Sequence, residues 1–342
     1  MKAISIPIKK AEEVRKFVVE NSLLDTNYLL KRDKDNLIMP VTETAKIIRK
    51  FRFVKKSKAK LNRREKKISS VKELLAHDLS MDELELVNRS YDVVGDIIIL
   101  DIPKELISKE KKIADAILKM NKSAKTVLKK AGIHEGEYRT QKMQFLAGED
   151  RKETIHRENN VLMKLDVEQV YFSPRLSNER KRIMTLVQSG ETILVMFSGC
   201  APYPVVISKN TKAQEIIGVE LNPFGHAYGI ENIFLNKCKN VKLISGDVRT
   251  IVPKLNMKFD RILMPLPKQA DTFLDVALAI SKKGTIIHLY DFVMESDFPK
   301  ITVDKIENAC KQAKLKYKVL DFVKCGQHSP KFNRVCVDFQ II

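Results

Sequence analysis

Two acidic residues follow consecutive apolar segments in the second half of the chain. Glu220 comes directly after the strand-like segment 215–219, in which residues 216–219 are apolar, and Asp247 comes shortly after the strand-like segment 241–244. Ligands of open α/β sheets bind at the carboxyl ends of the strands, where an acidic side chain accepts hydrogen bonds from ribose hydroxyls. The pair therefore indicates a site for an adenosine-containing ligand, with Glu220 on the ribose and Asp247 on the adenine amino group. Either acid alone is also compatible with a helix N-cap.

Two further turns complete this candidate site. Residues 196–202 place Gly199 among small neighbours, where backbone can approach a ligand, although a simple tight turn has the same pattern. Pro265 and Pro267 follow the apolar run 261–264 and indicate either a stiff loop that holds a target base or a plain strand terminator. The residues that we expect at the bound ligand are Phe197, Gly199, Glu220, Leu221, Asn222, Asp247, Val248 and Pro265.

Alternating strand and helix patterns from residue 166 onward would position these turns. The expected strands are 193–197, 215–219, 241–244, 261–264 and 285–289, with helical patterns such as 224–236 and 270–281 between them. Repeats of this kind form a parallel sheet covered on both faces. Segments 317–323 and 335–342 predict an antiparallel hairpin at the sheet edge. The layout is that of a Rossmann-like class I methyltransferase domain.

The preceding residues predict two smaller α/β domains, so that the chain divides into 1–67, 68–165 and 166–342. The first should contain a helix over Ala11–Leu24, a strand edge at 36–40 and a strand through Phe51 and Phe53. The elements expected in the second are helices at 71–76, 81–86 and 105–121, a strand at 91–102, and short strands at 127–129, 144–146, 154–156 and 161–165.

The net charge of +19, from 62 basic and 43 acidic residues, predicts a polyanionic partner, because Lys and Arg neutralise phosphates and release counterions. Twelve of the basic residues, and a single acid, lie between Lys46 and Lys67. A solubility bias spread over the surface would not concentrate charge in this way. We therefore expect residues 46–67 to contact nucleic acid.

Cysteine and histidine patterns argue against a metal centre or a disulfide framework. The five cysteines form no C-x-x-C pair. The six histidines are scattered and are expected to be structural or on the surface: His77, His134, His156, His226, His288 and His328. No apolar run approaches the ~20 residues of a membrane span, and the N-terminus lacks the apolar core of a signal peptide. A cytoplasmic protein without metal or membrane segment is expected.

Several longer tracts carry a family resemblance. They are Glu137–Arg139, Phe145–Glu149, Val170–Leu176 with Asn178–Arg180, Gly246–Arg249 and Met264–Lys268. Together they resemble the archaeal and eukaryotic tRNA guanine-N1 methyltransferases, which modify the purine at position 37. The resemblance covers nearly the whole chain, is most specific at 171–180 and 145–149, and is weak before residue 90. It implies S-adenosylmethionine as cofactor and tRNA, bound at its anticodon loop and elbow, as partner. The sequence does not settle the oligomeric state, and a monomer is the default expectation for an enzyme with RNA-binding domains of its own.

The resemblance also implies individual roles. Glu179 matches a general base and Arg139 an arginine that steadies the target purine through its carbonyl oxygen. The chemistry requires a base and a cation. N1 of guanine carries a proton that must be removed, and negative charge builds on the purine carbonyl oxygen as that proton leaves. Without the resemblance, Glu179 would be expected as an exposed acid in the first turn of a helix. The implied catalytic residues are Glu179, Arg139 and Pro265, and the implied substrate-binding residues are Arg139, Tyr171, Ser173, Arg175 and Lys268.

Three positions depart from the family pattern. Val195 stands where an acid is common, the glycine-rich turn is reduced to Ser198–Pro202, and Pro265 stands where Asn is usual. A proline at this position resembles an archaeal subset of the family. Members of that subset also methylate C7 of 4-demethylwyosine, a tricyclic guanosine derivative on the path to wyosine. Loss of an amide contact would widen the pocket for a third ring, so we hypothesise dual or altered specificity.

Two alternatives remain open from the sequence. One is an aminocarboxypropyl transferase of the wyosine pathway, which uses the same cofactor with a different carbon facing the base. The other is a non-catalytic RNA-binding protein on the same scaffold, which the departures at Val195 and in the first turn would suit. The presence of Glu179 and Arg139 favours methyl transfer, since both serve a ring nitrogen that loses its proton.

Overall fold

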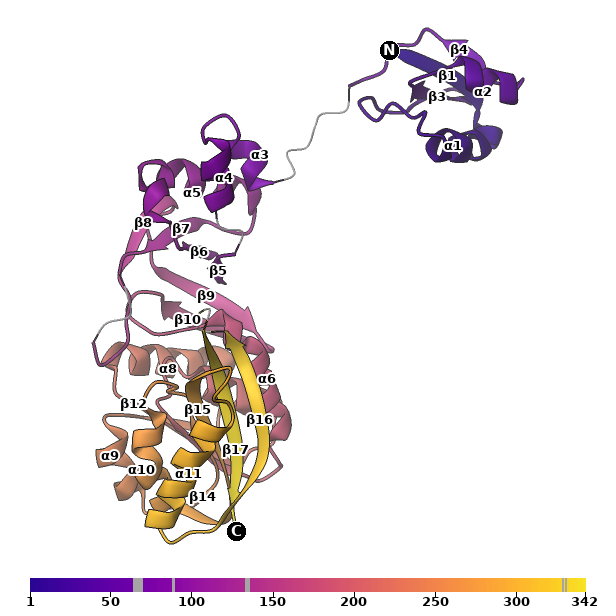
Figure 1. Ribbon diagram of the computed structural model, residues 1–342. Helices are drawn as coiled ribbons and strands as arrows, with labels where there is room; N and C mark the ends of the chain where they lie inside the picture. Colours follow the sequence, from indigo (N-terminus) through magenta and orange to yellow (C-terminus); the bar gives the residue numbers. More distant parts are fainter. Residues whose placement is uncertain (64–69, 88–89, 133–135, 328, 330) are drawn as a thin grey trace. The chain divides into compact units, whose positions relative to one another are not determined.

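The computed structural model describes residues 1–63, 70–87, 90–132, 136–327, 329 and 331–342. The chain divides into two compact units, Met1–Glu73 and Leu74–Ile342, whose elements are drawn in Figure 1. The expected domain boundary at residue 67 lies outside the described residues, as do His134 and His328, and the boundary at 165 falls within the second unit. The three-domain division therefore remains a prediction. No helix of the described ranges is long and apolar enough to cross a membrane.

A small antiparallel sheet with two helices forms the first unit. Its elements are β1 (Lys2–Pro7), the 3₁₀ helix η1 (Ile8–Lys10), α1 (Ala11–Glu20), β2 (Lys31–Asp33), β3 (Asn36–Val41), α2 (Ala45–Lys50) and β4 (Lys55–Ser57). The strand order is β2-β3-β1-β4. Ile4 of β1, Met39 of β3 and Val18 of α1 are fully buried in one core. Alternation on the strands and helical spacing on α1 thus bury one face of each element.

Two expectations for the first unit are wrong. Phe51 and Phe53 do not lie in a strand but in the turn between α2 and β4, where their ring centroids are 5.7 Å apart. Phe51 packs into the core directly before a turn. The alternation of apolar residues at Phe51 and Phe53 therefore reflects burial of an aromatic ring and not a strand. The segment 36–40 belongs to β3, which is an inner strand between β2 and β1 and not a sheet edge.

The second unit begins with a four-stranded mixed sheet. Its elements are α4 (Met81–Leu86), β5 (Asp92–Val94), β6 (Ile97–Leu100), η2 (Lys104–Lys109), α5 (Glu110–Met120), β7 (Thr126–Lys130) and β8 (Met143–Gly148), and α3 (Val71–Leu75) falls at the division between the units. The strand order is β5-β6-β7-β8, with β6 and β7 parallel. The single strand expected at 91–102 is instead the β5–β6 hairpin, because Gly95 takes a φ of +58° and turns the chain.

A seven-stranded sheet makes up most of the second unit. Its strands are β11 (Thr192–Met196), β12 (Glu215–Glu220), β13 (Val241–Ser245), β14 (Phe259–Met264), β15 (Ser281–Met294), β16 (Tyr317–Gln327) and β17 (Phe332–Ile341). The order is β13-β12-β11-β14-β15-β17-β16, with β17 antiparallel to both neighbours and the others parallel. Strand order reverses at β11, the kind of switch point at which such sheets bind ligands. The predicted Rossmann-like sheet with an edge hairpin is confirmed.

Helices cover both faces of this sheet (Figure 1). One face carries η3 (Pro174–Leu176), α6 (Ser177–Leu186), α7 (Pro202–Asn210) and α8 (Pro223–Asn236), and the other carries α9 (Val248–Ile251), η4 (Val252–Leu255), η5 (Ala270–Phe273), α10 (Leu274–Ala279) and α11 (Lys300–Gln312). Alternate residues of β11 divide between the two cores: Leu194 packs with α10, whereas Val195 packs with α6 and α7. The helix expected at 270–281 ends at Ala279, because β15 already begins at Ser281.

The hairpin of β9 (Glu153–Glu158) and β10 (Val161–Asp166) lies between the two larger sheets of this unit (Figure 1). On one side, Thr154 Oγ1 donates to Asp96 Oδ1 in the β5–β6 turn at 2.7 Å. On the other, Asn232 of α8 accepts at Oδ1 from the backbone N–H of Lys164 at 2.7 Å. The asparagine thereby satisfies a backbone donor at the free edge of β10.

Candidate active site

The turn after β11 brings backbone to the carboxyl edge of the sheet. Phe197, Gly199 and Ala201 have left-handed φ angles of +62°, +57° and +64°. α7 then begins at Pro202 without a side-chain cap, and uncapped amides at a helix N-terminus favour oxygen atoms or negative charge. A Cβ on Gly199 would meet only the carbonyl oxygen of Tyr171, at 3.9 Å. The turn therefore leaves room for a ligand against its backbone.

Glu220 closes this turn from the neighbouring strand. Its carboxylate accepts from the backbone N–H of Gly199 at 2.5 Å and from that of Asn222 at 2.8 Å. Burial raises the pKa of the Glu220 carboxyl above its ordinary value, against the lowering effect of these backbone donors. Each carboxylate oxygen can accept a further hydrogen bond, so the donor hydroxyls of a ribose fit this side chain.

Asn222 and Asp247 cap the helices that follow their strands. Asn222 Oδ1 accepts from the N–H of Phe224 at 3.0 Å, and its Nδ2 donates to the carbonyl of Gln169 at 2.8 Å. Asp247 Oδ1 accepts from the N–H of Arg249 at 2.7 Å, so the N-cap alternative describes this acid. The cap uses one oxygen, and the other suits an amino donor such as that of adenine.

The remaining residues predicted at the cofactor line the same turns. Phe197 meets Phe273 of η5 edge-on, with ring centroids 4.9 Å apart. Leu221 is half-buried, and Val248 is buried in the sheet core. The backbone N–H of Gly246 donates to the carbonyl of Glu220 at 2.9 Å. The turns after β12 and β13 are thus directly joined.

Residues 166–176 carry three of the predicted substrate residues past the turn after β11. The Tyr171 hydroxyl accepts from Arg334 Nη2 at 2.8 Å. The carbonyl of Ser173 accepts from Arg180 at 3.0 Å. Arg175 is exposed, and its Nε donates to an oxygen of Asp92 on β5 at 2.6 Å. In this structure the guanidinium of Arg175 is therefore held by a carboxylate.

Arg139 reaches the end of the loop that follows β14. Its Nη2 donates to Oε1 of Gln269 at 3.4 Å across 130 positions of sequence. Burial lowers the pKa of the Arg139 guanidinium below its ordinary value, against the raising effect of Tyr171. In the same loop Pro265 is half-buried and Lys268 is exposed. The segment before β8 and the loop after β14 thus meet at one edge of the sheet.

Glu179 lies in the first turn of α6 but is only 5% exposed, so the expectation of an exposed acid is wrong. Arg182 donates from Nε to Oε2 and from Nη2 to Oε1, each at 2.8 Å. The Tyr290 hydroxyl donates to Oε1 at 2.6 Å. These bonds compensate the burial of a carboxylate, which would otherwise be strongly unfavourable.

Strand register places this carboxylate near the ligand-binding edge. Leu289 of β15 lies opposite Met264, the last residue of β14. The next residues, Tyr290 and Pro265, are therefore level with each other. Through its bond to Tyr290, Glu179 lies at the end of the sheet that carries the predicted cofactor turns.

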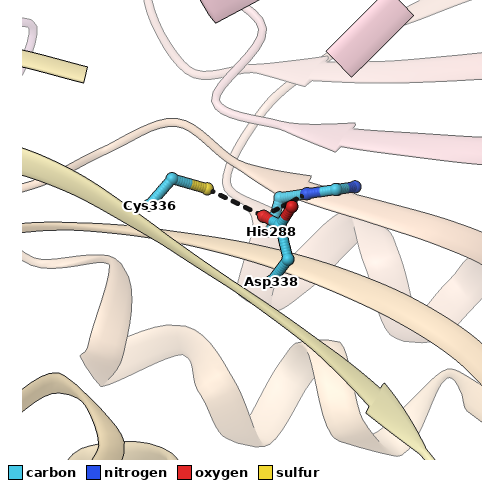
Figure 2. A group of neighbouring side chains, drawn as sticks. All are labelled: His288, Cys336 and Asp338. Carbon is cyan, nitrogen blue, oxygen red and sulfur yellow. Dashed lines mark hydrogen bonds and ion pairs between the residues drawn. The ribbon is translucent and has the colours of Figure 1, made fainter. Parts of the chain in front are cut away.

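A buried polar chain continues from Arg182. Its Nη1 donates to Asp338 Oδ2 at 2.6 Å, and Asp338 Oδ1 lies 2.6 Å from His288 Nδ1. Figure 2 shows His288 and Cys336 on either side of Asp338, and within the described residues these three are the group whose atoms could surround a metal ion. Arg182 and Arg261, the latter 2.7 Å from His288 Nε2, would repel a cation. We interpret the group as a hydrogen-bonded chain and not as a metal site.

Sequence reasoning missed the residues that hold Glu179. His288 and Tyr290 alternate on β15, and Asp338 and Cys336 lie directly opposite them on β17. Polar residues at positions i and i+2 of an otherwise apolar strand share one face, so this spacing was the available signal. It indicates a buried polar cluster but not its partner on α6, because the hydrogen bonds join segments more than 100 residues apart.

Family models match three stretches of the chain. Residues 3–48 match the tRNA methyltransferase 5 N-terminal domain, residues 71–151 the TYW2 N-terminal domain, and residues 154–320 the TRM5/TYW2 methyltransferase domain. The last stretch contains Glu179 and all the predicted cofactor residues.

Two relatives and a solved structure agree with these models. The chain is 36% identical to tRNA (guanine(37)-N(1))-methyltransferase Trm5b of Pyrococcus abyssi, over 99% of this chain and 98% of that protein. It is 33% identical to tRNA (guanine(37)-N(1))/4-demethylwyosine(37)-methyltransferase Taw22 of Nanoarchaeum equitans, over 74% of this chain and 100% of that protein. The structure of aTrm5 in complex with tRNALeu matches with a TM-score of 0.87 and 29% identity over 100% of both chains. The predicted resemblance is confirmed, and the chain belongs to the Trm5 family of tRNA (guanine(37)-N(1))-methyltransferases.

Proposed function

We propose that this chain methylates N1 of guanosine 37 in tRNA, with S-adenosylmethionine as the methyl donor. The observation that carries the proposal is the position of Glu179, whose partner Tyr290 is level with Pro265 at the carboxyl end of β14. A base at that edge can meet a purine held over the loop 265–268. Membership of the Trm5 family supports the same reaction.

The chain's own residues account for the proton and the charge. Guanine N1 carries a proton, so its attack on a methyl group needs a base within hydrogen-bond reach, and Glu179 takes this proton. The guanidinium of Arg139 stabilises the negative charge that develops on the purine carbonyl oxygen. Glu220 and Asp247 hold the ribose and the adenine of the cofactor. Bound S-adenosylmethionine supplies a methyl group already activated by its sulfonium charge, so positioning provides much of the remaining rate.

The RNA-binding roles divide among three domains, with boundaries near residues 67 and 165. The first domain contacts the tRNA elbow through the basic tract 46–67, in which Lys55 and Lys56 of β4 are exposed and residues 64–67 lie outside the described ranges. The anticodon loop lies against the loops that carry four further residues: Tyr171, Ser173, Arg175 and Lys268. The enzyme acts in the cytoplasm. It acts as a monomer, because it has RNA-binding domains of its own.

A second activity, methylation of C7 of 4-demethylwyosine, is favoured by Pro265. This residue offers only its backbone carbonyl to a purine, where an asparagine would offer an amide. The half-buried loop it occupies therefore has one polar contact less and more room for a third ring. The similarity to Taw22, whose name includes both reactions, supports this proposal.

Mass spectrometry of the nucleosides from two transcripts tests these proposals together. One transcript carries guanosine at position 37 and the other carries 4-demethylwyosine, and each is incubated with enzyme and S-adenosylmethionine. N1-methylguanosine from the first is the expected product, and a methyl group on both would support dual specificity. Pro265→Asn should then lower the yield from the tricyclic base relative to guanosine. An aminocarboxypropyl product, or no product from either, would refute the proposed function.

A further inference from the structure

The chain of hydrogen bonds that starts at Glu179 ends at Glu191, and its geometry sets its protonation states. Arg261 donates from Nε and Nη2 to the two oxygens of Glu191, at 2.8 and 2.9 Å. Its Nη1 lies 2.7 Å from His288 Nε2. A guanidinium has no acceptor, so Nε2 must accept, and His288 is the neutral tautomer whose Nδ1–H donates to Asp338. In agreement, burial lowers the pKa of His288 below its ordinary value.

This assignment leaves the network with one unbalanced negative charge. Its anions are Glu179, Asp338 and Glu191, and its cations are Arg182 and Arg261. The carboxylates of Glu179 and Asp338 are each 4% exposed, so water screens them little. An uncompensated charge in such surroundings is unfavourable. A proton on Glu179 would make the network neutral.

We propose that Tyr290 and Arg182 are positioning residues that hold Glu179 for proton transfer, and that the proton taken from N1 balances the charge of the network. The inference rests on the proposed function, in which Glu179 is the base. The N1–H bond breaks and its proton passes to Glu179, while N1 forms a bond to the methyl carbon. The carbon–sulfur bond breaks and its electron pair stays on sulfur. Oε1 accepts from both Arg182 and Tyr290, whereas Oε2 accepts from Arg182 Nε, and the Cys325 thiol also bonds the carboxylate. Each carboxylate oxygen has two lone pairs, so the group can still take a proton.

The groups that face Glu179 come from five elements. They are Arg182 of α6, Tyr203 of α7, Tyr290 of β15, Cys325 of β16, and Cys336 and Asp338 of β17. Burial raises the pKa of both tyrosine hydroxyls and of both thiols, so these four groups are neutral at physiological pH. Among the charged groups, Arg182 bonds the base and Asp338 bonds Arg182, and both are members of the network. The cations of Arg180 and Arg334 act on the neighbouring Tyr203 and Cys325.

The pH dependence of single-turnover methyl transfer to a transcript with guanosine 37 tests this inference. Tyr290→Phe removes one donor from Glu179, and a carboxylate that loses a donor holds a proton more tightly. The acidic limb of the rate profile should therefore move up by roughly 0.5 to 1 pH unit, the equivalent of one hydrogen bond. Asp338→Asn removes a negative charge, so its acidic limb should move in the opposite direction. Tyr203→Phe is the matched control, because Tyr203 donates to the Tyr290 hydroxyl at 3.0 Å and not to Glu179.

The outcomes separate the inference from the function on which it rests. An upward shift in Tyr290→Phe with no shift in Tyr203→Phe supports the positioning role. No shift in Tyr290→Phe, or equal shifts in the two tyrosine variants, overturns it, since lost packing alone would lower the rate without moving the limb selectively. If Asp338→Asn does not fold by circular dichroism, the tyrosine pair decides alone. If the wild type makes no N1-methylguanosine, or Glu179→Gln keeps the rate and its acidic limb, the proposed function itself is wrong.

Discussion

Replacing Glu158 by Gln should destabilise the second unit by about 3 kcal/mol at pH 7. The Glu158 carboxylate is 3% exposed and accepts from Arg180 Nε and Nη2 at 2.5 and 2.6 Å. Burial raises the pKa of Glu158, but hydrogen bonds from Arg180 and His156 outweigh it and lower the pKa from 4.5 to about 2. At 1.36 kcal/mol per pKa unit, this difference corresponds to about 3 kcal/mol. Removing one partner of a buried pair has a cost of the same size.

The sign of the pH dependence follows from the lowered pKa. Because the folded-state pKa of Glu158 lies below the unfolded value, its stabilisation is fully present above pH 4.5 and is lost as the pH falls toward 2. Urea denaturation followed by circular dichroism, between pH 7 and pH 3, should give a stability gap between wild type and Glu158→Gln that narrows below the unfolded pKa. Glu149→Gln is the control, since that carboxylate is 57% exposed in its pair with Arg151 and such pairs contribute little. A gap under about 1 kcal/mol at pH 7, or one that stays constant with pH, would refute the reasoning.

Three further perturbations bear on the proposed site. Glu220→Gln should weaken S-adenosylmethionine binding about 10- to 100-fold in calorimetry, because neutral acceptors bind hydroxyls less strongly than a carboxylate does; a dissociation constant close to that of the wild type would contradict this role. Arg139→Ala should lower the single-turnover rate about 100- to 1,000-fold without changing cofactor affinity, whereas a loss confined to cofactor affinity would assign the residue elsewhere. Lys55→Ala with Lys56→Ala should reduce the slope of log affinity for tRNA against log salt by about two, and an unchanged slope would exclude β4 from the RNA contact.

The fold of the second half could be predicted because each element has a strong local signal. Most of β11 is a continuous apolar run, and β12 and β14 contain the apolar runs 216–219 and 262–264, as expected where both faces of a strand are buried. The edge strand β13 is less buried. Boundaries failed where one residue decided the geometry. Gly95 turned an expected strand into a hairpin, and Phe51 placed an aromatic alternation in a turn after α2. In the second case a short apolar pattern fits two conformations, and tertiary burial selects one.

The candidate site was predictable only where it follows strand ends. Glu220 and Asp247 could be placed from spacing, because parallel strands bring their carboxyl ends to one edge. Glu179 needed the family resemblance, since a first-turn acid looks like any helix-stabilising carboxylate. Its burial results from Tyr290 on β15 and from Arg182, which is in turn held by Asp338. Hydrogen bonds between segments so far apart have no local sequence pattern, so they could not be predicted from any one segment alone.

Val195, which suits a non-catalytic RNA-binding protein on the same scaffold, also fits an active enzyme when the packing is considered. It is fully buried in the cluster that also contains Tyr203 and Tyr290. An acid at this position would add a second uncompensated charge to the side of the sheet that already holds the Glu179 network, at a large desolvation cost. The reduced turn still binds Glu220 through the N–H of Gly199. A scaffold kept only for its fold would gain from replacing buried ion pairs by apolar side chains, which is often neutral or stabilising. The charged network around Glu179 thus agrees with the proposed proton transfer, and the apolar Val195 beside it agrees with that network.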